Sequence, residues 1–193
     1  MRKVNFITEK ERQYPMRKNI VLTLTGPDRI GIVDTVTELL LQHGGNVETS
    51  RMARLGGEFA ILMLVSIPIE QLDGLDQQME TLRTQGYQVT TTPTERTFAE
   101  THPGWQPYQI QVFGADHQGI IHEIAHYLSH HSINVESMDT ETTRAPLSGA
   151  PLFTMNALVL VPPDLQTPSW ETALEDMGHR LNVDIQVDAV STQ

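Results

Sequence analysis

The chain has 193 residues, of which 39% are hydrophobic and 19% are charged, a balance typical of a folded globular protein that can bury a core. It contains no cysteine, which excludes disulfides, zinc-thiolate sites, iron-sulfur clusters and cysteine nucleophiles, and fits a reducing compartment. The first 18 residues lack the apolar run of a signal peptide, and no stretch approaches the roughly 18 apolar residues of a membrane span. We therefore expect a cytoplasmic protein with no membrane partner.

The net charge of −11 is unevenly distributed along the chain. Six of the 13 lysines and arginines lie in residues 1–18, whereas residues 19–193 hold seven arginines, no lysine and 22 of the 24 acidic residues. Proteins that bind nucleic acid neutralise its phosphates with Lys and Arg, so this acidic body predicts no direct nucleic-acid contact. A role in gene regulation would need a protein partner. The basic leader is either a tail that contacts an acidic surface or a disordered start.

An internal repeat accounts for the length of the chain. The segment "GPDRIGIVDTVTELLLQHGGNVE" from Gly26 aligns without a gap with "GADHQGIIHEIAHYLSHHSINVE" from Gly114, at an offset of 88 residues. Identical residues coincide at Gly26/Gly114, Asp28/Asp116, Gly31/Gly119, Ile32/Ile120, Leu40/Leu128, His43/His131, Asn46/Asn134, Val47/Val135 and Glu48/Glu136. Two copies of one unit are therefore expected.

Each copy predicts the same order of strands and helices. Apolar residues at three- and four-residue steps indicate helices, β-branched runs indicate strands, and Gly56-Gly57 favours a hairpin turn. The first unit is expected to have strands at 19–25, 46–55, 58–66 and 87–92, a helix at 32–42 and a second helix that begins at Pro68. The second unit is expected to have strands at 108–114, 133–142, 152–161 and 183–190 and helices at 119–131 and 170–181. Both read as βαββαβ.

This order predicts an α+β fold of two tandem ferredoxin-like units, each an antiparallel sheet with two helices on one face. The expected divisions are a basic leader at 1–18, domains at 19–94 and 107–190, and a polar, proline-containing linker at 95–106. Sheets of this kind leave edges that often pair, so we expect a homo-oligomer. Because the fold hosts many functions, function has to come from the sites.

The loop between the first strand and the first helix is the main candidate site. Gly26 and Gly31 have the glycine spacing of a phosphate loop, but the lysine and the hydroxyl that would follow are absent. Asp28 would also repel a phosphate. A zwitterion fits better, because the amides of a helix N-terminus can hold a carboxylate while Asp28 receives an ammonium. Asn46, at the start of the next strand, could add an amide that both donates and accepts.

Structural roles compete with this interpretation. Asp28 and Asp116 could be N-caps of the helices that follow, with the glycines only permitting the turn. Asn46 and Asn134 could be residues that tolerate left-handed backbone at a corner. The sequence leaves both alternatives open.

The stretch "TGPDRIGIV" followed by "HGGNVETSRMARLGGEFAILMLVS" resembles the ACT domain. The tandem arrangement from residue 19 to about residue 190 resembles the glycine cleavage system transcriptional repressor family. The resemblance implies a regulatory protein with no catalytic residues, whose modules pair side by side and bind a small amino acid, with glycine as the signal and a LysR-type activator as partner. The contacts it implies are Asp28, Arg29, Ile30, Gly31 and Asn46 in the first unit, and Asp116, His117, Gly119 and Asn134 in the second.

Other constellations favour neither a cofactor nor an enzyme. His122, His126 and His130 recur at four-residue steps, opposite an expected apolar face of Ile121, Ile124, Ala125 and Leu128, and a solvated face explains them without a metal. No pattern arranges the serines and histidines for catalysis. The alternative functions are an allosteric ACT subunit of an enzyme of amino-acid metabolism and a metal-binding protein. Methionines 63, 79, 138, 155 and 177 are expected to fill the core or an interface.

Overall fold

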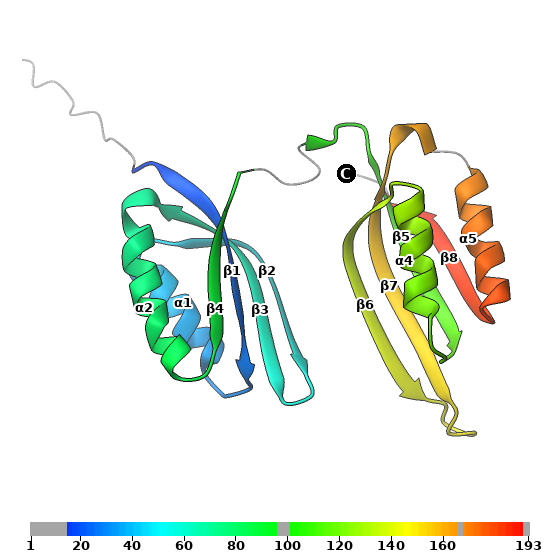
Figure 1. Ribbon diagram of the computed structural model, residues 1–193, viewed down its shortest axis with the longest axis horizontal. Coiled ribbons are helices and arrows are strands. Elements are labelled where there is room, and N and C mark those ends of the chain that lie inside the picture. The colour runs from blue at the N-terminus through cyan, green and yellow to red at the C-terminus, as the bar shows by residue number, and fades with distance from the viewer. Residues whose placement is uncertain (1–14, 96–100, 166–167, 191–193) are drawn as a thin grey trace, which may run out of the picture. The chain divides into compact units, whose positions relative to one another are not determined.

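The computed structural model describes residues 15–95, 101–165 and 168–190. The chain divides into two compact units, with the boundary between residues 96 and 97. Each unit contains one four-stranded antiparallel sheet (Figure 1). The predicted fold of tandem ferredoxin-like units is confirmed. Within the described ranges, no helix is long and apolar enough to cross a membrane.

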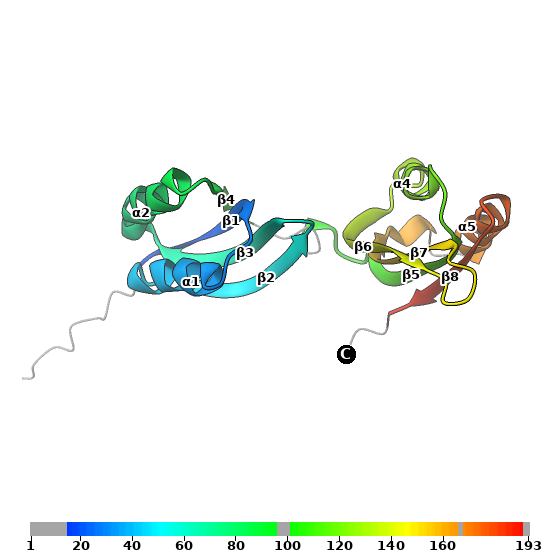
Figure 2. The same ribbon diagram turned by 90° about the horizontal axis from the view of Figure 1, so that it is seen from below.

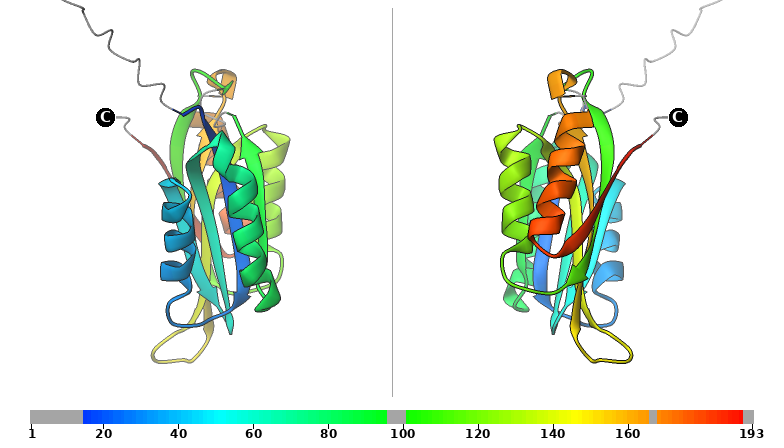
Figure 3. Two further views of the ribbon diagram at one scale, coloured as in Figure 1. Left: turned by 90° about the vertical axis from the view of Figure 1, so that its left-hand side faces the viewer. Right: turned by 90° about the vertical axis from the view of Figure 1, so that its right-hand side faces the viewer.

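Unit 1 has its helices on a single face of the sheet (Figure 3, left). The strands lie in the order β2-β3-β1-β4, so the first strand pairs with the third and the fourth. The 3-10 turn η1 separates β3 from α2, so the second helix begins later than the predicted Pro68, which is the last residue of β3. The elements are β1 (Arg17–Pro27), α1 (Ile32–Gln42), β2 (Asn46–Leu55), β3 (Glu58–Pro68), η1 (Ile69–Gln71), α2 (Leu72–Thr84) and β4 (Gln88–Thr94).

Unit 2 repeats this arrangement with the strand order β6-β7-β5-β8. Its two long helices also lie on one face of the sheet (Figures 2 and 3). The elements are β5 (Gln106–Ala115), α4 (Ile120–His130), β6 (Asn134–Arg144), β7 (Pro151–Val161), η2 (Pro163–Leu165), α5 (Pro168–Arg180) and β8 (Val183–Ala189).

Each unit buries its own core between the helices and the sheet. In α1 the buried positions are Ile32, Val36 and Leu40, one per turn, and the same spacing recurs in α4. The predicted role of the methionines is confirmed: residues 63, 79, 155 and 177 are buried, and Met138 packs against the core of unit 2. The prediction for the face of α4 was partly wrong, since Ile121 and Ala125 are exposed. The buried stripe is Ile120, Ile124 and Leu128.

The first strand begins at Arg17, two residues before the predicted start. Arg17 pairs with Pro68 in the sheet, and its guanidinium donates to Ser66 Oγ at 2.9 Å and to the Gly44 carbonyl at 2.9 Å. The last two residues of the predicted basic leader therefore belong to unit 1. Residues 1–14 of that leader lie outside the described residues.

Several repeated residues serve the turns that end the first helix of each unit. Nδ1 of His43 lies 2.8 Å from the Leu39 carbonyl, and Nδ1 of His131 lies 2.9 Å from the Tyr127 carbonyl. Gly44 follows with a φ of 66°, and Ser132, at the same offset of 88, takes a φ of 56°. The left-handed corners are thus at Gly44 and Ser132. The alternative that Asn46 and Asn134 adopt left-handed backbone is wrong.

Gly114 gives a test of the packing between the end of β5 and the start of β8. A Cβ added there would lie 2.8 Å from the Val183 Cα and 3.0 Å from the Asn182 carbonyl oxygen, which are backbone atoms that cannot move aside cheaply. We predict that Gly114→Ala destabilises unit 2 by about 1–3 kcal/mol, measured by urea unfolding.

Gly57→Ala is the matched control, because its added Cβ meets nothing within 4 Å and its backbone is not left-handed. It should change stability by less than about 0.5 kcal/mol. Equal effects of the two variants would contradict the packing argument.

Candidate functional site

The first helix of each unit begins on a glycine in the left-handed region. Gly31 precedes α1 with a φ of 89°, and Gly119 precedes α4 with a φ of 100°. An L side chain adopts this conformation only under strain. A Cβ at either glycine would meet nothing within 4 Å, so these glycines are needed for the turn and not for space.

The loop before each glycine is fixed to the hairpin of its own unit. The Asp28 amide donates to the Gly57 carbonyl at 3.1 Å, and the Asp116 amide donates to the Pro151 carbonyl at 3.0 Å. In unit 1, Tyr87 Oη also donates to the Pro27 carbonyl at 2.9 Å. The two aspartates are therefore held at the same corner of the fold, where the first strand ends and the first helix begins.

The alternative role of Asp28 and Asp116 as N-caps was wrong. The N-cap residues are Gly31 and Gly119, and neither helix has a side-chain cap hydrogen bond. The left-handed glycine places each aspartate three residues before the cap. The amides of the first helical turn, which have no partner inside a helix, are thus left without a side-chain acceptor. Such amides, together with the helix dipole, favour an anion at this position.

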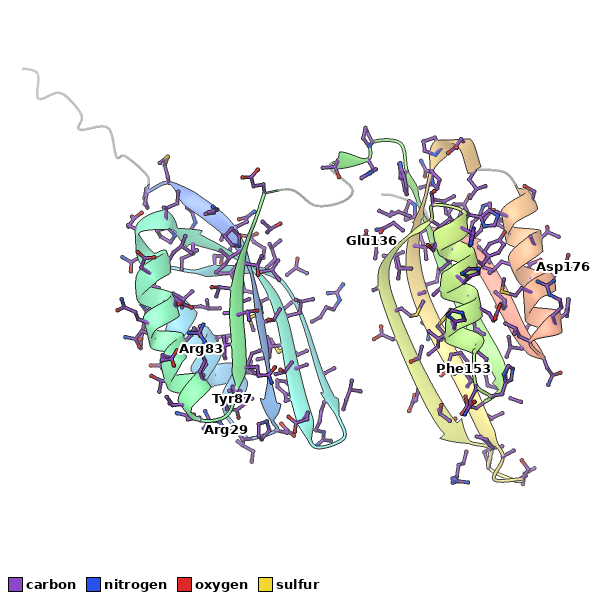
Figure 4. The ribbon with its side chains drawn as sticks, in the orientation of Figure 1. Arg29, Arg83, Tyr87, Glu136, Phe153 and Asp176 are labelled. Atoms are coloured by element: carbon purple, nitrogen blue, oxygen red, sulfur yellow. The ribbon has the colours of Figure 1, made fainter. Side chains whose placement is uncertain are left out.

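Asn46 and Asn134 are not brought to these loops within their own units. Asn46 begins β2, whereas Asp28 lies beside the other end of that strand, ten residues and about 30 Å away. Figure 4 shows the same separation in unit 2, with Glu136 near the start of β6 and Phe153 near the start of α4.

These asparagines hold a β-bulge in each unit. The register of β2 against β3 shifts between Val47 and Thr49, and that of β6 against β7 shifts between Val135 and Ser137. The amide of Asn46 donates to the carboxylate of Glu48 at 2.9 Å, and Asn134 donates to Glu136 at 2.8 Å. The repeated "NVE" triplet thus has a structural role that the sequence pattern did not indicate.

In unit 2 the loop borders a hollow of about 560 Å³. Asp116 lies half-buried at its edge, and Phe153 of β7 is buried beside it. The lining residues are Asp116, His117, Gln118, Gly119, Ile120, Ile121, His122, Thr140, Glu141, Thr142 and Phe153. Three of the four residues predicted for this unit line the hollow, whereas Asn134 does not. The sequence reading missed Thr140, Glu141, Thr142 and Phe153, because they come from strands far along the chain.

The residues after the two aspartates are held differently. The Arg29 guanidinium carbon lies 5.3 Å from the centre of the Tyr87 ring, and Figure 4 shows the two side chains together. His117 takes the place of Arg29 in unit 2, with Nε2 2.6 Å from the Leu181 carbonyl and Nδ1 3.1 Å from the Gln118 carbonyl. Ile30, another predicted contact, is fully exposed.

The contacts of His117 raise the pKa of its imidazole above the ordinary value of 6.5. The carbonyl of Leu181 is the largest cause and that of Gln118 the next. Both ring nitrogens can donate to these carbonyls at once only when the ring is protonated. Unit 2 thus favours a cation next to Asp116.

The histidine rings of α4 form a row on an exposed face, with the first pair stacked and the second pair edge to face. The ring centres of His122 and His126 are 5.9 Å apart, and those of His126 and His130 are 4.4 Å apart. Over residues 15–95, 101–165 and 168–190, no group of three or more His, Cys, Asp or Glu is arranged to hold a metal ion.

Comparison with known proteins bears on the class of this fold and site. A family model of the ACT domain matches residues 18–91, which is most of unit 1. An unknown protein from Galdieria sulphuraria has a crystal structure with a TM-score of 0.80 and 31% identity, covering 91% of this chain and 100% of that one. Unit 1 is therefore an ACT domain, and unit 2 repeats its strand order.

A more particular likeness extends over nearly the whole chain. The glycine cleavage system transcriptional repressor of Escherichia coli (strain K12) is 26% identical over 174 residues, which are 89% of this chain and 90% of that protein. A crystal structure provisionally assigned to such a repressor has a TM-score of 0.65 at 21% identity and covers 92% of this chain and 99% of that one, which bears on the fold alone. The predicted resemblance to this repressor family is confirmed.

The contacts of His117 predict a pH dependence of the stability of unit 2. Because the pKa is higher in the folded than in the unfolded state, the stabilisation is fully present below pH 6.5 and is lost as the pH rises through the folded-state pKa. His117→Gln should therefore lower the urea midpoint of unit 2 more at about pH 5.5 than at about pH 9.

His117→Arg is the control, because it places the unit 1 residue here and stays charged at both pH values. The difference in urea midpoint between His117→Arg and His117→Gln should therefore be the same at about pH 5.5 and at about pH 9. A difference between wild type and His117→Gln that is equal at both pH values would show that the imidazolium contributes nothing.

Proposed function

We propose that the chain is a non-enzymatic regulatory protein that senses a small amino acid, glycine first, and acts on gene expression through a protein partner. The observation that carries the proposal is the pairing, in both units, of an uncapped helix N-terminus with an aspartate in the same loop. These two features have opposite charge preferences. One ligand satisfies both if it carries a carboxylate and an ammonium.

The chemistry of an α-amino acid follows this arrangement. Its carboxylate accepts hydrogen bonds from the first-turn amides of the helix and lies at the positive end of the helix dipole. Its ammonium donates to the aspartate, a charge-assisted hydrogen bond that is stronger than a neutral one. The loop thus supplies complementary charges for holding such a ligand, which suits a sensor.

Self-association would complete the site with the asparagines. Strands β2 and β6 each lie at one edge of a sheet, with backbone groups free to pair with another strand. Antiparallel pairing of an edge strand with its equivalent in a second copy of the chain places Asn46 or Asn134 of one copy beside the loop end of the other. A homodimer is therefore part of the proposal.

The partner is proposed to be a DNA-binding regulator, with a LysR-type activator as the candidate. The support is the likeness to a transcriptional repressor, together with the acidic charge of residues 19–193, which contain only seven arginines and no lysine. That charge disfavours direct phosphate contacts. A gel-shift assay in which the chain alone retards promoter DNA at physiological salt would contradict this part.

The expected compartment is the cytoplasm.

Thermal unfolding in the presence of each of the twenty amino acids tests the sensor. A ligand that binds only the folded state stabilises it by about 2.7 kcal/mol at about 100 times its Kd. Glycine or a close neighbour should raise the Tm, and the Asp28→Asn/Asp116→Asn double variant should lose this rise while retaining its fold.

Asp34→Asn is the matched control, since Asp34 is an exposed carboxylate in the first turn of α1 but outside the loop. It should keep the rise in Tm. A rise that survives in the double variant would place the ligand elsewhere. No rise with any amino acid would refute the sensor.

A further inference from the structure

The two loops differ in the residue that faces the aspartate. The offset of 88 that aligns the repeat also aligns Arg54 with Thr142. In unit 1, Arg54 Nη1 lies 3.5 Å from Asp28 Oδ2 and forms an ion pair with it. In unit 2, Thr142 Oγ1 donates to Asp116 Oδ2 at 3.5 Å. The same carboxylate thus faces a cation in one unit and a neutral hydroxyl in the other.

A second exchange adds negative charge to unit 2. Ala53 of unit 1 aligns with Glu141 of unit 2, a residue that borders the same hollow as Asp116. Because successive side chains of a strand point to opposite faces, the Glu141 side chain lies on the other face of β6 from Thr142, which contacts Asp116. Within the described part of the chain, no lysine or arginine nitrogen lies within 4 Å of a carboxylate oxygen of Asp116, so this carboxylate has no ion pair with either residue type.

The neighbouring cations add to this contrast. In unit 1 the Arg54 guanidinium is paired with Asp28, and the Arg29 guanidinium lies over the Tyr87 ring. In unit 2, His117 takes the place of Arg29, and both of its ring nitrogens are directed at backbone carbonyls. An ammonium that approaches Asp28 has to displace a guanidinium that is already paired with this carboxylate, whereas Asp116 lies near His117 but has no paired guanidinium to displace among the described residues.

We propose that unit 2 holds the amino-acid site, with the ammonium of the ligand on Asp116 and its carboxylate on the first amides of α4, and that Arg54 closes the loop of unit 1 to an ammonium. This inference rests on the proposed function and assigns it to one of two similar loops. The negative charges of Asp116 and of Glu141, on the other face of β6, also set the ligand class: amino acids with neutral side chains bind, and aspartate and glutamate are disfavoured.

Exchanging the two facing residues tests the assignment by isothermal titration calorimetry of the full chain with glycine. Wild type should bind one glycine per chain. Thr142→Arg gives unit 2 the residue of unit 1. It should weaken glycine binding by about ten- to a hundredfold, because the new guanidinium competes with the glycine ammonium for the Asp116 carboxylate. Arg54→Thr should leave glycine binding at unit 2 intact. Aspartate should bind wild type at least about tenfold more weakly than glycine, because the negative charges of Asp116 and Glu141 disfavour its side-chain carboxylate.

Asp116→Asn and Asp28→Asn are the matched pair for the carboxylates. Each keeps the size of the side chain, and circular dichroism checks the fold. Asp116→Asn should abolish the heat of glycine binding and Asp28→Asn should leave it unchanged. The reverse result, or two equal glycine sites in wild type, would overturn the assignment while the sensor stands. A wild type that binds neither glycine, alanine nor serine would overturn both.

Discussion

The left-handed glycine at the start of each first helix is the constraint on which the rest of the structure depends. Gly31 and Gly119 turn the chain from the first strand onto the face of the sheet, so that Ile32 and Ile120 enter the core one residue later. The same turn carries the aspartate out of capping position. Each helix therefore begins without a side-chain cap and next to a carboxylate, a combination that suits a zwitterion.

Most of the fold could be predicted from the sequence because the chain contains its unit twice. A repeat at an offset of 88 fixes the equivalent elements, and the spacing of Ile32, Val36 and Leu40 identifies the buried face of the first helix. The ends of the strands and the borders of the buried helix faces were less predictable. Arg17 extends β1 through hydrogen bonds to β3, and Ile121 is exposed although it fits the apolar pattern, because only backbone geometry decides which face meets the sheet.

The site was less predictable, since spacing along a strand says little about which end of the fold a residue reaches. Asn46 is close to the loop in sequence terms but lies at the other end of β2, where it pairs with Glu48 across a bulge. Conversely, Arg54 and Thr142 face the aspartates from the far end of that strand and its counterpart. Extending the comparison of the repeat from Glu48 to Arg54 would have found this exchange. Identical residues thus mark the shared scaffold, whereas the differing ones mark the loops.

The central claim is that an amino acid binds at the start of the first helix, between its amides and the aspartate. The most direct measurement is a ¹H–¹⁵N NMR titration of the full chain with glycine, followed at the backbone amides. The account predicts the largest shifts at Asp116, Gly119, Ile120 and Ile121, with much smaller changes at Asp28 and Gly31. Saturable shifts confined to other elements, or none at all, would contradict it.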